Sequence, residues 1–184
     1  MNNIEIAFSF MLKANRGKKF KFDDIDKSFH SLCVGLLLME VDNVAEDIVC
    51  AGILHDIINE TDYGYEDLEK TFGKKIATIV QELSEDMSIA KWLDRKKEYV
   101  KRIRRIDDPQ ILNIVVADKY NYLMVLYNSV KDFNKIYKYS GGSSTENRYL
   151  YKELYNICLK AGCDEKLMNK YAKILDILFG NTEF

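Results

Sequence analysis

The chain has 184 residues, enough for one domain that buries most of its apolar surface, and its net charge of −2 gives no basic footprint for nucleic acid. Its four cysteines lack CxxC spacing, so we expect reduced thiols in a cytoplasmic protein. The N-terminus has no basic signal region, and the longest apolar run is too short to cross a bilayer. One proline, nine glycines and long stretches of helical period predict an all-α fold.

Helical periodicity predicts the elements in chain order, at about 4–14, through His30 to 41–42, 44–58, 65–71, 74–83, 89–106, from 109 toward 137, 146–161 and 165–179. Asn43 and Ser88 are expected to cap the helices that follow them, and Pro109 to begin one. Residues 140–144, Ser-Gly-Gly-Ser-Ser, are expected to be a linker between helices. We expect a single domain over 1–184, with a core of about 4–137 and C-terminal helices at about 146–180.

The most apolar predicted helix, 44–58, carries His55 and Asp56 side by side away from its polar face. A carboxylate on an apolar face is costly unless it is paired or bound to metal. His30 lies on an apolar stripe of the preceding helix, and Asp118 is centred among apolar residues of a later one. Each residue alone is compatible with an ordinary core His or paired Asp. Together they favour a metal site of two His and two Asp, for which we expect Mn²⁺, with Fe²⁺ or Zn²⁺ as alternatives.

The order His30, His55-Asp56, Asp118 resembles the pattern of the HD-domain phosphohydrolases. Residues 55–61, His-Asp-Ile-Ile-Asn-Glu-Thr, are similar to the HDxxEDT motif of the RelA/SpoT alarmone hydrolases and their metazoan homologue. Further blocks follow in that family's order, at Phe72-Gly73, Ser84-Glu85-Asp86, 93–97 and 116–119. The resemblance covers about 4–127. It implies an HD-domain helical bundle with a mononuclear metal site between its helices.

Asn59 and Glu60 lie one predicted turn beyond the His-Asp pair. A metal lowers the pKa of a bound water, and Glu60 is placed to exchange a proton with that water or with the leaving group. The resembled family has Glu-Asp here, and both residues serve the attacking water or leaving group. Asn59 can orient a water but cannot accept its proton, which leaves rate and substrate open. The alternative is that both residues merely end a helix in solvent.

The resemblance also implies substrate-binding residues for a highly anionic nucleotide. Lys19 and Lys21 lie where the family has an Arg-Lys pair, although the alignment is ambiguous there and a solvated loop is the alternative. Arg95 and Lys96 match another basic pair of the family. Asn121 lies one residue before the family's Asn position, which here is Tyr122 and could stack on a base or fill the core.

The activity implied by the resemblance is removal of the 3′-pyrophosphate of (p)ppGpp to give GDP or GTP. Two alternatives stay open. One is an HD phosphatase acting on another nucleotide, such as a nucleoside monophosphate or NADPH. The other is a catalytically impaired regulatory module. We expect a small nucleotide as the partner, with no nucleic acid and no membrane, and an oligomeric state that the sequence leaves open.

Overall fold

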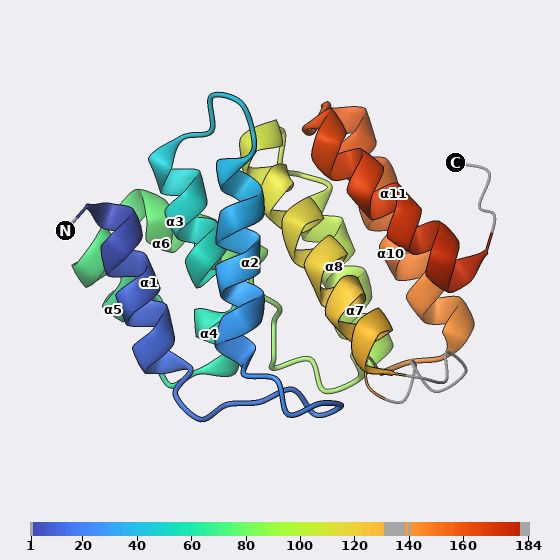
Figure 1. The fold of residues 1–184 in the computed structure, drawn as a ribbon, viewed down its shortest axis with the longest axis horizontal. Helices are drawn as coiled ribbons and strands as arrows, with labels where there is room; N and C mark the ends of the chain where they lie inside the picture. Colours follow the sequence, from blue (N-terminus) through green and yellow to red (C-terminus); the bar gives the residue numbers. More distant parts are fainter. Residues whose placement is uncertain (1, 131–138, 140, 181–184) are drawn as a thin grey trace.

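A computed structural model describes residues 2–130, 139 and 141–180 of the chain (Figure 1). Its helices, in chain order, are α1 (Asn3–Ala14), α2 (Lys27–Met39), α3 (Glu46–Leu54), α4 (Ile57–Glu60), α5 (Tyr65–Phe72), α6 (Lys74–Leu83), α7 (Trp92–Ile103), α8 (Pro109–Ser129), α10 (Ser144–Ala161) and α11 (Glu165–Phe179). The all-α prediction is confirmed. None of the helices described here is long and apolar enough to cross a bilayer.

Helix α8 runs through the middle of the bundle, with α2 along one side and α11 along the other (Figure 1). It also packs against α3 and α10, and its buried residues extend over most of its length. One hydrophobic cluster reaches from Ala7 in α1 to Leu175 in α11, so the C-terminal helices share their interior with the rest of the bundle. Tyr171 strengthens this packing by donating its hydroxyl to the carbonyl of Tyr151 at 3.0 Å.

Helices α2 and α3 approach closely because each places a glycine in their interface. A Cβ on Gly35 would lie 2.6 Å from Cγ1 of Ile53, and one on Gly52 would lie 2.1 Å from Cδ1 of Leu38. Both distances are too short for carbon atoms in a packed core, so glycine is needed for this spacing. The close approach sets the N-terminal part of α2 beside the C-terminal end of α3, where the two histidines lie.

The prediction of one helix over 44–58 is wrong, because the helix breaks at His55 and Asp56 between α3 and α4. The Asp56 backbone adopts φ −92° and ψ −5°, outside the helical minimum. Consecutive side chains of a helix point about 100° apart, so in an unbroken helix His55 and Asp56 would point in different directions. The break instead leaves His55 Nε2 and Asp56 Oδ2 only 3.3 Å apart. Asn43, with φ +57°, does not cap α3, whose N-cap is Ala45.

Two other helix starts differ from the predicted ones, and in each case side-chain hydrogen bonds account for the difference. Ser88 does not cap α7, because its N–H and hydroxyl both donate to Oδ1 of Asp86, at 3.0 and 2.6 Å. Helix α10 begins two residues earlier than predicted, capped by Ser143 with Glu146 in a capping box. The predicted extension of α8 toward 137 falls on residues 131–138, outside the described part of the chain. The predicted ends at Gly73 and Pro109 are confirmed.

Candidate active site

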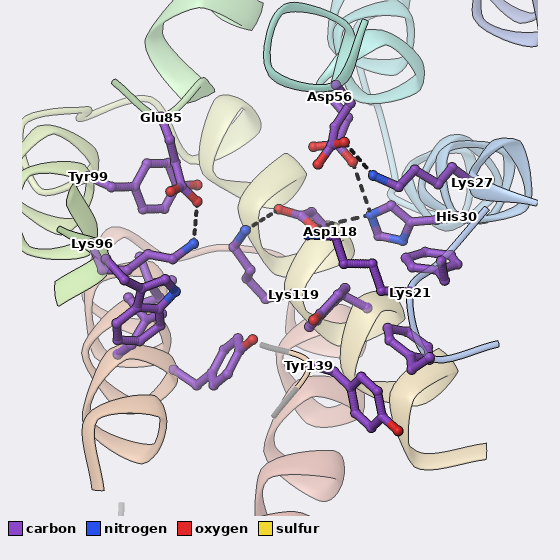
Figure 2. A pocket seen from close by; sticks show the side chains of 18 residues that line it. Lys21, Lys27, His30, Asp56, Glu85, Lys96, Tyr99, Asp118, Lys119 and Tyr139 are labelled. Carbon is purple, nitrogen blue, oxygen red and sulfur yellow. Dashed lines mark hydrogen bonds and ion pairs between the residues drawn. The ribbon is translucent and has the colours of Figure 1, made fainter. Parts of the chain in front are cut away.

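Four side chains from three parts of the chain lie close together. Figure 2 shows three of them, His30, Asp56 and Asp118. His30 comes from α2, His55 and Asp56 from the break between α3 and α4, and Asp118 from α8. Oδ1 of Asp118 lies 3.2 Å from Nε2 of His30 and 3.7 Å from Nε2 of His55. Oδ2 of Asp56 lies 3.9 and 3.3 Å from the same two nitrogens. The structure therefore brings together all the residues that the sequence proposes as metal ligands.

Hydrogen bonds at the outer nitrogen of each imidazole fix the orientation of both rings. His30 Nδ1 donates to Oδ1 of Asn121 at 2.8 Å, and His55 Nδ1 donates to the carbonyl of Gly52 at 2.7 Å. Both partners are acceptors, which assigns the ring proton to Nδ1 and leaves Nε2 as a lone-pair donor. His55 Nε2 is buried and has no hydrogen-bond partner among the described residues. A buried, unpartnered nitrogen held this way fits a metal ion.

The charges of the cluster also call for a cation. Burial lowers the pKa of His55, but the carboxylates of Asp56 and Asp118 outweigh it and raise that pKa to about 9. Burial raises the pKa of Asp56, yet the two imidazoles lower it to about 2. The pKa of Asp118 is also lowered, against its burial, first by Lys119, whose Nζ lies 2.6 Å from Oδ2. Without an ion, a proton on His55 supplies part of the positive charge that a divalent metal would bring.

Three of these four side chains, those of His30, Asp56 and Asp118, line a cavity of about 250 Å³. Its lining carries positive charge from Lys21, Lys27, Lys96 and Lys119, and the carboxylate of Glu85 lies near the ammonium of Lys96 (Figure 2). The carboxylate of Glu60 also lines it. Aromatic side chains form much of the remaining wall, from Phe20, Phe22, Trp92, Tyr99, Tyr122, Tyr139 and Tyr151. Lysines suit phosphate groups and aromatic faces suit a base. The cavity thus combines surfaces suited to both parts of a nucleotide beside the proposed metal ligands.

Glu60, Lys21 and Lys96 line the cavity, as their proposed roles require. The carboxylate of Glu60 pairs with Lys27, and Lys96 pairs with Glu85.

Four other proposed residues lie elsewhere. Lys19 pairs with Asp24 at 2.5 Å on an exposed loop and does not line the cavity. Arg95 donates to Glu85 at 3.0 Å and to the carbonyl of Ile89 at 2.9 Å, also away from the lining. Asn121 touches His30, and the amide of Asn59 is bonded to the main chain of Glu85. Asn121 and Asn59 therefore contact other residues of the site and do not line the cavity themselves.

Two lysines of the cavity were not proposed from the sequence. Lys27 lies three residues before His30, on the same face of α2, and this spacing was a signal that could have found it. Lys119 follows Asp118 directly, and its Nζ lies 5.3 Å above the ring of Tyr99. A lysine next to a carboxylate in sequence gives no sign that both turn inward, so only the structure identifies Lys119.

Comparison with known proteins agrees with this geometry. A family model described as an HD domain matches residues 7–138. The chain belongs to the HD-domain family.

Two solved structures share the fold of this HD-domain chain. The structure of a metazoan ortholog of SpoT, whose title says that it hydrolyses ppGpp, has a TM-score of 0.81 at 20% identity and covers 98% of each chain. That of lmo0812 from Listeria monocytogenes EGD-e has a TM-score of 0.70 at 22% identity, over 83% of this chain and 94% of the other. The predicted HD-domain bundle is confirmed.

Curated relatives of this HD-domain chain include guanosine-3′,5′-bis(diphosphate) 3′-pyrophosphohydrolase MESH1 of Drosophila melanogaster, 32% identical over 48% of each protein. MESH1 of Danio rerio is 30% identical over 58% of this chain and 54% of its own. The bifunctional (p)ppGpp synthase/hydrolase SpoT of Escherichia coli K12 is 28% identical over 53% of this chain and 14% of its own. The chain spans about half the length of the MESH1 proteins that it matches and a small part of SpoT.

Proposed function

We propose that this protein is a metal-dependent phosphohydrolase that removes the 3′-pyrophosphate of (p)ppGpp, giving GDP or GTP. The observation that carries the proposal is the meeting of two imidazoles and two carboxylates, three of which line a cavity together with four lysines. The names of the MESH1 and SpoT relatives support the choice of substrate. The shared hydrophobic core supports a single hydrolase domain, and the four free thiols support a cytoplasmic enzyme.

His30, His55, Asp56 and Asp118 would hold the ion. We infer Mn²⁺, since two carboxylates beside two imidazoles make a harder ligand set than thiolates do, with Fe²⁺ or Zn²⁺ as alternatives. A divalent ion bound there supplies Lewis-acid polarisation of a phosphoryl group and lowers the pKa of a water toward neutrality.

Glu60 is the group that we assign to proton transfer. Its carboxylate lines the cavity on α4, one residue beyond Asn59 and four beyond Asp56. It can take a proton from the attacking water as the water oxygen bonds to phosphorus. It can then give that proton to the 3′ oxygen as the bond from that oxygen to phosphorus breaks. The ammonium of Lys27 pairs with this carboxylate.

The lysines and the aromatic wall account for substrate binding. Lys21, Lys96 and Lys119 are placed to bind the phosphates, which carry most of the substrate's charge. Phe20 and Phe22 stack on each other with their ring centroids 5.0 Å apart, and they form an apolar surface at the cavity wall for the base.

A phosphate and pyrophosphate release screen tests the proposal. The Mn²⁺-loaded protein is incubated with ppGpp, NADPH and nucleoside monophosphates, and the products are separated by anion-exchange chromatography. We expect pyrophosphate and GDP from ppGpp, at a higher kcat/KM than for the other substrates. Preferred turnover of NADPH or a monophosphate would instead assign the site to another nucleotide. No turnover of any of them, by protein that holds its metal, would favour the impaired regulatory module.

A further inference from the structure

The side chain of Asn59 binds the main chain of a distant residue through both of its polar atoms. Its Nδ2 donates to the carbonyl of Glu85 at 2.9 Å, and its Oδ1 accepts the N–H of Glu85 at 2.7 Å. Asn59 is half-buried and does not line the cavity. Through these two bonds the amide joins α4 to the segment after α6 as a second peptide group would.

This pair of bonds requires an amide. A carboxylate can accept from the Glu85 N–H but has no hydrogen to donate to the Glu85 carbonyl. An ionised oxygen set against that carbonyl would repel it. The Glu that the resembled family has at this place therefore could not make the same contact. Asn59 therefore has a role that the family's Glu cannot have, which is to bind the main chain of Glu85 through both polar atoms.

Glu85 connects the contact to the cavity. Its Oε2 accepts from Nε of Arg95 at 3.0 Å, and its Oε1 accepts from the ammonium of Lys96. The side chains of Glu85 and Lys96 are each only 19% exposed, and both residues line the cavity. Burial raises the pKa of Glu85, but Lys96 and the other cations outweigh it and keep the group ionised. The position of the Lys96 ammonium thus depends on where the Glu85 main chain is held.

We propose that Asn59 is a positioning residue which, through Glu85, fixes the Lys96 ammonium in the cavity to meet an anionic group of the substrate. The inference rests on the proposed function for the identity of that anion, a phosphate of the nucleotide. It leaves Glu60 as the one carboxylate of the 59–60 pair and gives proton transfer to it alone.

Kinetics of the Mn²⁺-loaded protein separate this role from one at the attacked phosphorus. In Asn59→Asp, loss of one hydrogen bond and displacement of Lys96 should raise KM for ppGpp about tenfold and leave kcat within about twofold. Glu85→Gln should raise KM in the same direction with the Asn59 contact intact. Because both changes act through Lys96, the double variant should be little worse than Glu85→Gln alone. A fall in kcat of tenfold or more with unchanged KM in Asn59→Asp would overturn the proposal.

A second measurement does not depend on turnover. Lysine acetylation by a water-soluble active ester, followed by peptide mass spectrometry, reports how firmly each ammonium is held. Lys96 should react several-fold faster in Asn59→Asp and in Glu85→Gln than in the wild type. Lys170 is the internal control, because its ion pair with Glu40, at 2.6 Å, lies outside the cavity lining and its rate should not change. Unaltered Lys96 labelling in Glu85→Gln, which needs no change at Asn59, would overturn the positioning role even if ppGpp proves not to be the substrate.

Discussion

The bond between His30 and Asn121 makes a quantitative prediction about metal affinity. The two atoms are 2.8 Å apart, and both residues are buried, at 3% and 9% exposure. Asn121→Leu removes the acceptor and leaves the Nδ1–H of His30 unsatisfied in the interior, which costs about 1–3 kcal/mol. Since 1.4 kcal/mol is about tenfold in an equilibrium constant, we expect metal affinity to fall roughly 10- to 100-fold, the range typical of residues that orient a ligand.

Competition with a calibrated fluorescent chelator measures this change directly. Asn121→Asp keeps an acceptor for the imidazole, so its affinity should match or exceed that of the wild type. Asn113 provides a matched control, because it is a buried asparagine of the same helix whose Oδ1 accepts the N–H of Asp164 at 2.9 Å, away from the ligands. Asn113→Leu should lower the melting temperature without changing metal affinity. If Asn121→Leu keeps wild-type metal affinity but raises KM, this reasoning is refuted and Asn121 is a substrate-binding residue instead.

Three further predictions concern catalysis, binding and pH. Glu60→Gln should keep the metal and the fold but lower kcat by about 100-fold or more, and near wild-type kcat would assign proton transfer elsewhere. Lys21→Ala should raise KM and flatten its dependence on salt, whereas Lys19→Ala should leave both unchanged because that ammonium lies outside the cavity. Because the carboxylates raise the pKa of His55 to about 9 despite its burial, metal must displace a proton at neutral pH. Metal affinity should therefore rise with pH and level off above about 9, and calorimetry in buffers of different ionisation enthalpy should detect about one proton released per ion at pH 7.

The four proposed ligands could be chosen from the sequence because they break its apolar pattern. Polar side chains at 30, 55, 56 and 118 lie on stripes that are otherwise apolar, and a helical wheel is enough to reveal that conflict. The helix break at 55–56 could not be predicted, because 44–58 has unbroken helical periodicity. The helix breaks there because of contacts in the assembled site, and these override the local preference for a helix.

The supporting residues were harder to assign, since each depends on a partner far away in the chain. Asn121 lies three residues after Asp118, on the same face of α8, so the sequence places it near the site but cannot choose between substrate and His30. The choice between Lys19 and Lys21 depends on backbone bonds across the loop, from Phe20 to Ile25 and from Lys27 to Lys18, which decide the side of the loop that faces the cavity. No periodicity encodes such bonds.

Metal content is the most direct test of the central claim that His30, His55, Asp56 and Asp118 hold one divalent ion. Inductively coupled plasma mass spectrometry of protein purified with Mn²⁺ should find about one transition ion per chain in the wild type. His55→Ala and Asp118→Ala should each retain little or none, and chelation should lower the melting temperature of the wild type alone, because the ion joins separate helices. Full metal occupancy in both variants would contradict the assignment.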